Sequence, residues 1–233
     1  MTTLHYIYDP LCGWCYGAAP LVAAARQQLP VIAHGGGMMA YQNRKAVTAS
    51  LRNFVIPHDQ KIAQLTGQPF GQAYFGGLLR DNNAVFDSEP PIAAILAAEK
   101  LAKRGLDLLA LIQNAHYVEG QRIAELAVLS KLATKIGIDR DVFAYEYQNQ
   151  MGAKTKAHIA DSREFLQRVG GQGFPTFVHE QSGIFTVINH ALYFGDLEGW
   201  HELLATLKPT ATNEETQPMA ACSVDHCTSD PEI

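Results

Sequence analysis

Cysteine is scarce in this sequence, with four residues in a chain of 233, which excludes the disulfide-rich scaffolds. No apolar run approaches the roughly 18 residues that a membrane-spanning helix needs. The N-terminus also lacks the basic segment, apolar stretch and small-residue cleavage site of a secretory signal peptide. We therefore expect a cytoplasmic protein that has no membrane contact.

Basic residues are absent after Lys208. The five acidic residues beyond it account for the net charge of -5, because the preceding chain carries 18 basic and 18 acidic side chains. Proteins that bind nucleic acids present a basic stripe to the phosphate backbone. A neutral body of this kind predicts that the protein has no nucleic-acid partner.

The first 40 residues contain three short segments with clear patterns. Residues 4–8 are rich in tyrosine and isoleucine and predict a strand. The alanine and leucine density from 13 to about 28 predicts a helix, and residues 31–34 predict a second strand. A strand, a helix and a strand joined by short links predict a βαβ unit with parallel strands.

The stretch from about 41 to 170 is rich in alanine, leucine, glutamine and glutamate at helical spacing. The apolar residues recur at every third or fourth position within 92–104 and 123–136. We predict about five to seven helices in this stretch and no strand.

Strand signals return at 176–179 and 184–188, and the residues between them predict a hairpin with a four-residue loop. A last helix is expected at about 196–207. This order of elements predicts an α/β protein with a thioredoxin-like mixed four-stranded sheet and a large all-helical insertion. The predicted organisation is a first thioredoxin-like part (1–40), a helical insertion (41–170), a second thioredoxin-like part (171–208) and a mobile acidic tail (209–233).

Two cysteines stand where the first predicted strand passes into the first helix: Cys12 and Cys15, separated by Gly13 and Trp14. The first turn of a helix offers unpaired N–H groups and the positive end of the dipole, which stabilise a thiolate at Cys12. Cys15 faces the same side one turn later and is placed to attack a mixed disulfide formed at Cys12. We predict that Cys12 is the nucleophile and Cys15 the resolving thiol of a redox centre.

This cysteine pair has two other interpretations. A zinc site would need two further ligands. The only other cysteines lie in the tail, and the histidines show no ligand spacing. We therefore predict no metal. Inert buried cysteines would not need the placement between strand and helix. A lone CxxC motif is moderately specific, and its placement here favours the redox interpretation.

Residues 8–17 (YDPLCGWCYG) resemble the active-site segment of the DsbA family of thioredoxin-fold disulfide oxidoreductases, and are most similar to its FrnE-like cytoplasmic branch. Residues 170–176 (GGQGFPT) resemble the second signature of that family, whose proline is cis and faces the CxxC motif. The resemblance extends to the start of the acidic tail. It implies that Pro175 exposes the backbone of Phe174 to a substrate chain, which pairs by strand addition.

The resemblance also implies an activity, which is disulfide exchange with protein or peptide thiols. The electron partner would be glutathione or a thioredoxin system, with no bound organic cofactor. The dipeptide between the cysteines is Gly-Trp, not the Pro-His of the best-known members. Because tryptophan carries no positive charge, we expect a less oxidising pair than in the periplasmic oxidases, and the direction of electron flow stays open.

An aspartate before the motif and the aromatic residues around the active site have two interpretations each. Asp9 would raise the pKa of a nearby thiol and relay a proton, or it only forms the turn before the helix. Trp14 and Tyr16 are predicted to rim the active site as an aromatic patch for unfolded or peptide substrates, with Phe174 contributing. Core packing is the rival interpretation for these aromatic side chains.

A second cysteine pair, Cys222 and Cys227, lies in the acidic tail. It is interpreted as a second redox pair that carries a disulfide to and from the first pair, at high effective concentration. The alternatives are a weak metal site that includes His226, and cysteines without a role.

Two rival functions belong to other classes. The kappa-class glutathione transferases and the 2-hydroxychromene-2-carboxylate isomerases look similar in layout, but typically carry serine where Cys12 stands. A redox-sensing or chaperone-like binding module is the other rival. Turnover separates this module from an enzyme, because a sensor would not catalyse insulin reduction.

Overall fold

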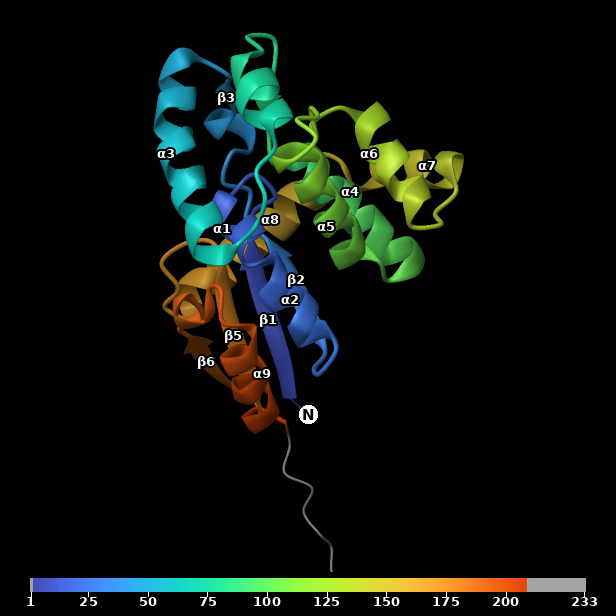
Figure 1. The fold of residues 1–233 in the computed structure, drawn as a ribbon. Helices are drawn as coiled ribbons and strands as arrows, with labels where there is room; N and C mark the ends of the chain where they lie inside the picture. The colour runs from blue at the N-terminus through green and yellow to red at the C-terminus, as the bar shows by residue number, and fades with distance from the viewer. Residues whose placement is uncertain (1, 209–233) are drawn as a thin grey trace, which may run out of the picture.

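The structure is a computed structural model, and it describes residues 2–208. Its centre is a four-stranded sheet in the order β2-β1-β5-β6 (Figure 1). The strands are β1 (Thr2–Tyr8), β2 (Val31–Gly35), β5 (Thr176–Gln181) and β6 (Ile184–Ile188). Strand β2 is parallel to β1, and the other two neighbouring pairs are antiparallel, so the predicted mixed sheet is confirmed.

Helices lie on both faces of this sheet and extend well beyond its upper edge (Figure 1). The α-helices of residues 2–208 are α1 (Gly13–Gly17), α2 (Ala19–Arg26), α3 (Ala49–Thr66), α4 (Glu89–Ala102), α5 (Gly105–Tyr117), α6 (Leu126–Lys135), α7 (Arg140–Gln150), α8 (Ala153–Arg168) and α9 (Leu197–Thr206). Short helical turns are η1 (Tyr41–Asn43), η2 (Ala73–Gly77), η3 (Leu78–Arg80) and η4 (His190–Tyr193). None of the helices in this part of the chain is both long and apolar enough to cross a bilayer.

Strand β1 lies in the middle of the sheet and is buried along almost its whole length. On one face the Tyr6 ring contacts Phe177 of β5, which in turn contacts Trp200 of α9. On the other face Ile7 packs against Phe165 of α8. The alternating side chains of β1 are thus covered on both faces, as expected for a central strand.

The predicted helix from 13 to 28 is wrong in one respect, because two helices meet at Ala18. Pro20 has no N–H group to donate to the carbonyl group of Tyr16, and its ring disfavours a continuous helix. Ala18 adopts φ -83° and ψ -2°, and α2 restarts with Pro20 in its first turn, where proline is tolerated. The short α1 therefore presents the CxxC segment as a separate turn of helix.

The prediction of no strand within 41–170 is also wrong. Strand β3 (Lys45–Ala46) pairs antiparallel with β4 (Val85–Phe86). A ladder of two residues a side is too short to give a period-2 pattern in the sequence. The six α-helices of this stretch agree with the predicted number.

The hairpin between β5 and β6 has a two-residue loop instead of the predicted four. Both loop residues, Ser182 and Gly183, have positive φ, at 53° and 80°. That pair of conformations is typical of a type I′ turn, whose twist matches the twist of the flanking strands. The ladder therefore extends to Gln181 and Ile184.

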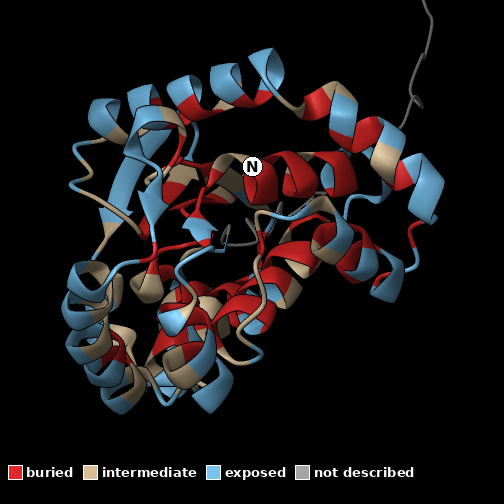
Figure 2. Ribbon diagram, turned by 90° about the horizontal axis from the view of Figure 1, so that it is seen from above, coloured by how far each residue is buried: buried red, intermediate tan, exposed pale blue. Residues whose placement is uncertain are grey.

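Helices α5 to α8 pack around α4, whose two prolines, four of its alanines and two isoleucines are buried. Small side chains allow α5, α7 and α8 to approach α4 closely. Figure 2 shows the result, with buried residues concentrated in the sheet and on the inward faces of the surrounding helices.

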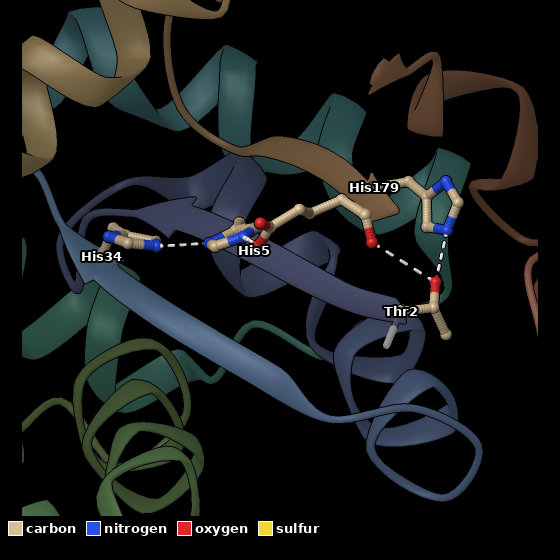
Figure 3. Close-up of polar contacts among 5 residues, drawn as sticks. Thr2, His5, His34 and His179 are labelled. Atoms are coloured by element: carbon tan, nitrogen blue, oxygen red, sulfur yellow. Dashed lines mark hydrogen bonds and ion pairs between the residues drawn. The ribbon is translucent and has the colours of Figure 1, made fainter. Parts of the chain in front are cut away.

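A row of polar side chains crosses the sheet from β2 to β5 (Figure 3). His34 Nε2 lies 2.9 Å from His5 Nδ1, and His5 Nε2 lies 2.8 Å from a carboxylate oxygen of Glu180. Thr2 Oγ1 lies 2.6 Å from His179 Nε2 at the N-terminal end of β1. Burial, and then the neighbouring His5 and His158, lower the pKa of His34 to about 4.

Folding stability should therefore fall in acid. The unfolded chain binds a proton at His34 below about pH 6.5, while the folded chain keeps this ring neutral until its pKa near 4. Between these values the free energy of unfolding drops by about 1.4 kcal/mol per pH unit for this one proton. Urea unfolding at pH 7, 6, 5 and 4.5 measures this slope. In the variant His34→Gln the free energy of unfolding should fall less steeply with decreasing pH, by about 1.4 kcal/mol per pH unit. Equal slopes in the two proteins would contradict the assignment of this proton to His34.

Candidate active site

The CxxC segment begins where β1 ends. Cys12 is the N-cap of α1, with φ -91° and ψ 115°, and its carbonyl group accepts hydrogen bonds from Cys15 N and Tyr16 N at 3.0 and 3.1 Å. Both cysteines are free thiols with low exposure, 7% for Cys12 and none for Cys15. The strand end, the turn and the first helical turn thus place the two thiols one helical turn apart.

The segment that resembles the second signature lies directly opposite Cys12. The peptide bond between Phe174 and Pro175 is cis. The Cys12 thiol donates a hydrogen bond to the Phe174 carbonyl group, with a distance of 3.4 Å between sulfur and oxygen. The ring of Phe174 covers Gly36, where a Cβ atom would lie 2.1 Å from Phe174 Cζ. Glycine at 36 therefore makes room for the ring that holds this loop against Cys12.

Cys15 points into the protein. Its sulfur accepts a hydrogen bond from the backbone N–H of Asp9, at 3.4 Å. Burial raises the pKa of Cys15 well above its usual value, and the neighbouring Cys12 raises it further, while the hydrogen bond from the Asp9 N–H acts in the opposite direction. A thiol in this setting stays protonated, so the more exposed Cys12 is the better nucleophile of the two.

Asp9 is completely buried, and its carboxylate joins three segments. It accepts hydrogen bonds from Leu11 N at 2.9 Å, Ser88 Oγ at 2.9 Å and Met38 N at 2.5 Å. Burial raises the pKa of Asp9 despite these three donors. The side chain of Asp9 thus forms the turn before the helix, and its charge acts to raise the pKa of Cys15 while its N–H group acts to lower it. The role of Asp9 as a proton relay stays a prediction.

A groove of about 610 Å³ runs beside the two loops. It is lined by Trp14, residues 170–176, residues 187–191 and Phe194, and none of these residues carries a formal charge. The Trp14 ring stacks on Phe194, with ring centroids 5.5 Å apart. An uncharged groove with aromatic walls suits an extended peptide chain.

Tyr16 does not rim this groove with Trp14, so that expectation is wrong. Its ring is buried, stacks on Tyr117 and contacts Phe70. Its hydroxyl group donates to the Pro69 carbonyl group at 2.7 Å. Tyr16 is buried because it packs against aromatic residues of the segment 41–170. These residues are distant in the sequence, so no local pattern predicts the contact.

One residue beside the motif, Asp59, has no signal in the sequence that points to the site. Asp59 of α3 lies against Gly13, and its Oδ2 atom accepts a hydrogen bond from the hydroxyl group of Tyr74 at 2.8 Å. In the sequence Asp59 follows His58 within a polar stretch, which is typical of a solvated helix face. Cys222 and Cys227 lie outside the described residues.

No protein-family model matches this chain, and no curated protein does. Among solved structures, the cytosolic disulfide reductase DsbM from Pseudomonas aeruginosa is 53% identical, with a TM-score of 0.83 over 88% of this chain and 97% of that chain. The chain belongs to the DsbA family. A structure of DsbM with GSH is 52% identical, with a TM-score of 0.81 over 88% of this DsbA-family chain and 98% of that chain.

A third structure, a 2-hydroxychromene-2-carboxylate isomerase, is 16% identical to this chain, with a TM-score of 0.57 over 87% of this chain and 96% of that chain. At this identity the likeness extends to the fold alone. The DsbA-family protein described here is a thiol-disulfide oxidoreductase, as its sequence predicted.

Proposed function

We propose that this DsbA-family protein reduces disulfides of protein or peptide substrates in the cytoplasm, through Cys12 and Cys15, with glutathione as the electron donor. The observation that carries the proposal is the position of the Cys12 thiol, 3.4 Å from the Phe174 carbonyl oxygen, beside an uncharged groove. The names of two similar structures, a cytosolic disulfide reductase and the same reductase with GSH, support the direction, the location and the electron donor.

The proposed cycle moves two electrons to the substrate. The Cys12 thiolate attacks one sulfur of the substrate disulfide, whose S–S bond breaks, and the leaving sulfur takes up a proton. Cys15 then loses its proton and attacks the Cys12 sulfur, which releases the second substrate thiol and leaves a disulfide between the two cysteines. Two glutathione molecules restore the two thiols and are joined as glutathione disulfide.

The remaining site residues take supporting roles in this proposal. Trp14 forms a wall of the groove, and Phe174 and Pro175 present backbone groups to an extended substrate chain. Gly13 allows the close approach of α3 to the motif. Asp9 fixes the turn before Cys12 and keeps the resolving thiol protonated until it is needed.

A glutathione redox titration tests the proposal. The protein used is the full chain with Cys222→Ser and Cys227→Ser, so that only the first pair reports, and alkylation with mass spectrometry reads its state. A single two-electron transition near the potential of thioredoxin, about -270 mV, is the expected result for a reductase. A potential of about -120 to -180 mV would make the protein an oxidase or isomerase. Absence of an internal disulfide at every ratio of glutathione to its disulfide would reject the redox pair and favour glutathione-dependent isomerisation.

A further inference from the structure

Helix α3 of the insertion lies directly on the helix that carries the CxxC motif, and two glycines make this contact possible. A Cβ atom on Gly13 would lie 2.6 Å from Asp59 Oδ1 and 2.9 Å from Ile62 Cδ1. A Cβ atom on Gly17 would lie 2.8 Å from Ile62 Cγ2. The first residue between the two cysteines is therefore glycine because a side chain of α3 occupies the space beside it.

The group that occupies this space is a carboxyl group with little access to water. Asp59 is 5% exposed, and no ion pair reaches it within residues 2–208. Its hydrogen-bond donor is the Tyr74 hydroxyl group of η2, at 2.8 Å. Burial raises the pKa of Asp59 to about 6, against the opposite effects of the Tyr74 hydrogen bond and of His58. At neutral pH the carboxyl group is therefore mostly ionised.

The thiols and Asp59 belong to one electrostatic environment. Tyr117 of α5 stacks on Tyr16 of α1 and also contacts Tyr74. Burial raises the pKa of Tyr117 well above its usual value, and the charges of Tyr74, Asp59 and the two cysteines raise it further. The titratable groups that act on Asp59 are thus His58 on its own helix and Tyr74 on η2, and Tyr117 on α5 is influenced by both Asp59 and the two cysteines.

We propose that Asp59 is a positioning residue whose negative charge, held against Gly13, disfavours the Cys12 thiolate and so makes the redox pair more reducing. Two negative charges that lie close together with little water between them repel each other, so each disfavours the ionised form of the other group. A thiolate that is less stable makes the reduced form less stable, which lowers the reduction potential. This inference rests on the proposed role of Cys12 as the nucleophile of a disulfide reductase.

A packing role alone would not need the charge. Asparagine has almost the shape of aspartate and would fill the space beside Gly13 equally well. The charge is instead kept in a buried place without a cation partner, where it opposes folding because the unfolded chain ionises more easily. In this fold the absence of a side chain at Gly13 leaves space beside the CxxC motif, and Asp59 of α3 places a negative charge in that space.

The decisive variant is Asp59→Asn, in the full chain with Cys222→Ser and Cys227→Ser. We expect the equilibrium with glutathione at pH 8 to favour the reduced pair about tenfold more than in the parent, which corresponds to a potential about 30 mV less negative. This difference should vanish below the pKa of Asp59, near 6, where the carboxyl group of the parent is neutral.

The matched control is Tyr74→Phe, which keeps the charge and the ring but removes the hydrogen bond. Without this donor the pKa of Asp59 rises, so the control should behave like the parent at pH 8.5 and like Asp59→Asn near pH 6.5. If Asp59→Asn does not fold, this pH pattern of Tyr74→Phe decides on its own.

Three outcomes separate the claims. A normal transition in the parent with an unshifted potential in Asp59→Asn overturns the role of Asp59 and leaves the reductase intact. A Tyr74→Phe protein that matches the parent at every pH also overturns it. A parent without any transition between thiols and disulfide overturns the redox pair itself, and with it this inference.

Discussion

A Cys15→Ser variant should accumulate a mixed disulfide at Cys12, whereas a Cys12→Ser variant should form none. In the first protein the nucleophile and its position beside Phe174 remain, but the thiol that would resolve the intermediate is missing. In the second protein the remaining thiol is fully buried and has a raised pKa. Disulfide reduction by Cys12→Ser should therefore fall by about a thousandfold or more, since removing a nucleophile disables the whole unit.

Trapping measures this difference directly. Each variant, with the tail cysteines also replaced by serine, is incubated with a peptide that contains one disulfide and is then analysed by non-reducing mass spectrometry. The double variant with neither active-site cysteine is the matched control. An adduct on Cys15 in the Cys12→Ser protein, equal in yield to the adduct on Cys12, would contradict the assigned order of attack.

The variant Gly71→Ala should lose about 3 to 4 kcal/mol of folding stability, which is in the range of the most damaging core substitutions. The N–H group of Gly71 donates to the Tyr117 carbonyl group at 2.8 Å. A Cβ atom on Gly71 would lie 1.9 Å from the backbone oxygen of Val118, which cannot rotate away as a side chain can. The substitution therefore forces the segment before η2 away from the end of α5.

Thermal and urea unfolding test this expectation. For a chain of this size the loss corresponds to a fall in Tm of roughly 10 °C. Gly77→Ala is the matched control, because it lies in the same segment and a Cβ atom there meets nothing within 4 Å. Its stability should stay within about 0.5 kcal/mol of the parent. Equal losses in the two variants would show that the contact with Val118 does not limit this segment.

Much of the fold could be predicted because its signals are local. The βαβ start, the last hairpin and the last helix follow from patterns that span fewer than about 20 residues. The position of Cys12 and Cys15 between strand and helix is visible for the same reason. The break between α1 and α2 was missed although Pro20 marks it, because alanine and leucine are dense on both sides.

The missed parts of the site depend on contacts between distant segments. Ser88 reaches the Asp9 carboxylate from 79 residues away, and the sequence around it has no feature that points to the motif. Asp59 and Gly13 lie on different helices, and each has an ordinary local interpretation. The distance between them follows from how α3 packs on α1, which is a property of the whole insertion.

The sheet at the centre of this enzyme has a consequence for its synthesis. Strand β1 pairs with β5, and the loop that shelters Cys12 contains Phe174, 162 residues later in the chain. At ribosomal speeds of about 5 to 20 residues per second, roughly 10 to 30 s pass between the synthesis of these two residues. During that interval the emerging chain carries two cysteines that have neither the cover of the second loop nor a finished sheet. An oxidant should therefore react with the thiols of newly made, incomplete chains before it reacts with those of the folded protein.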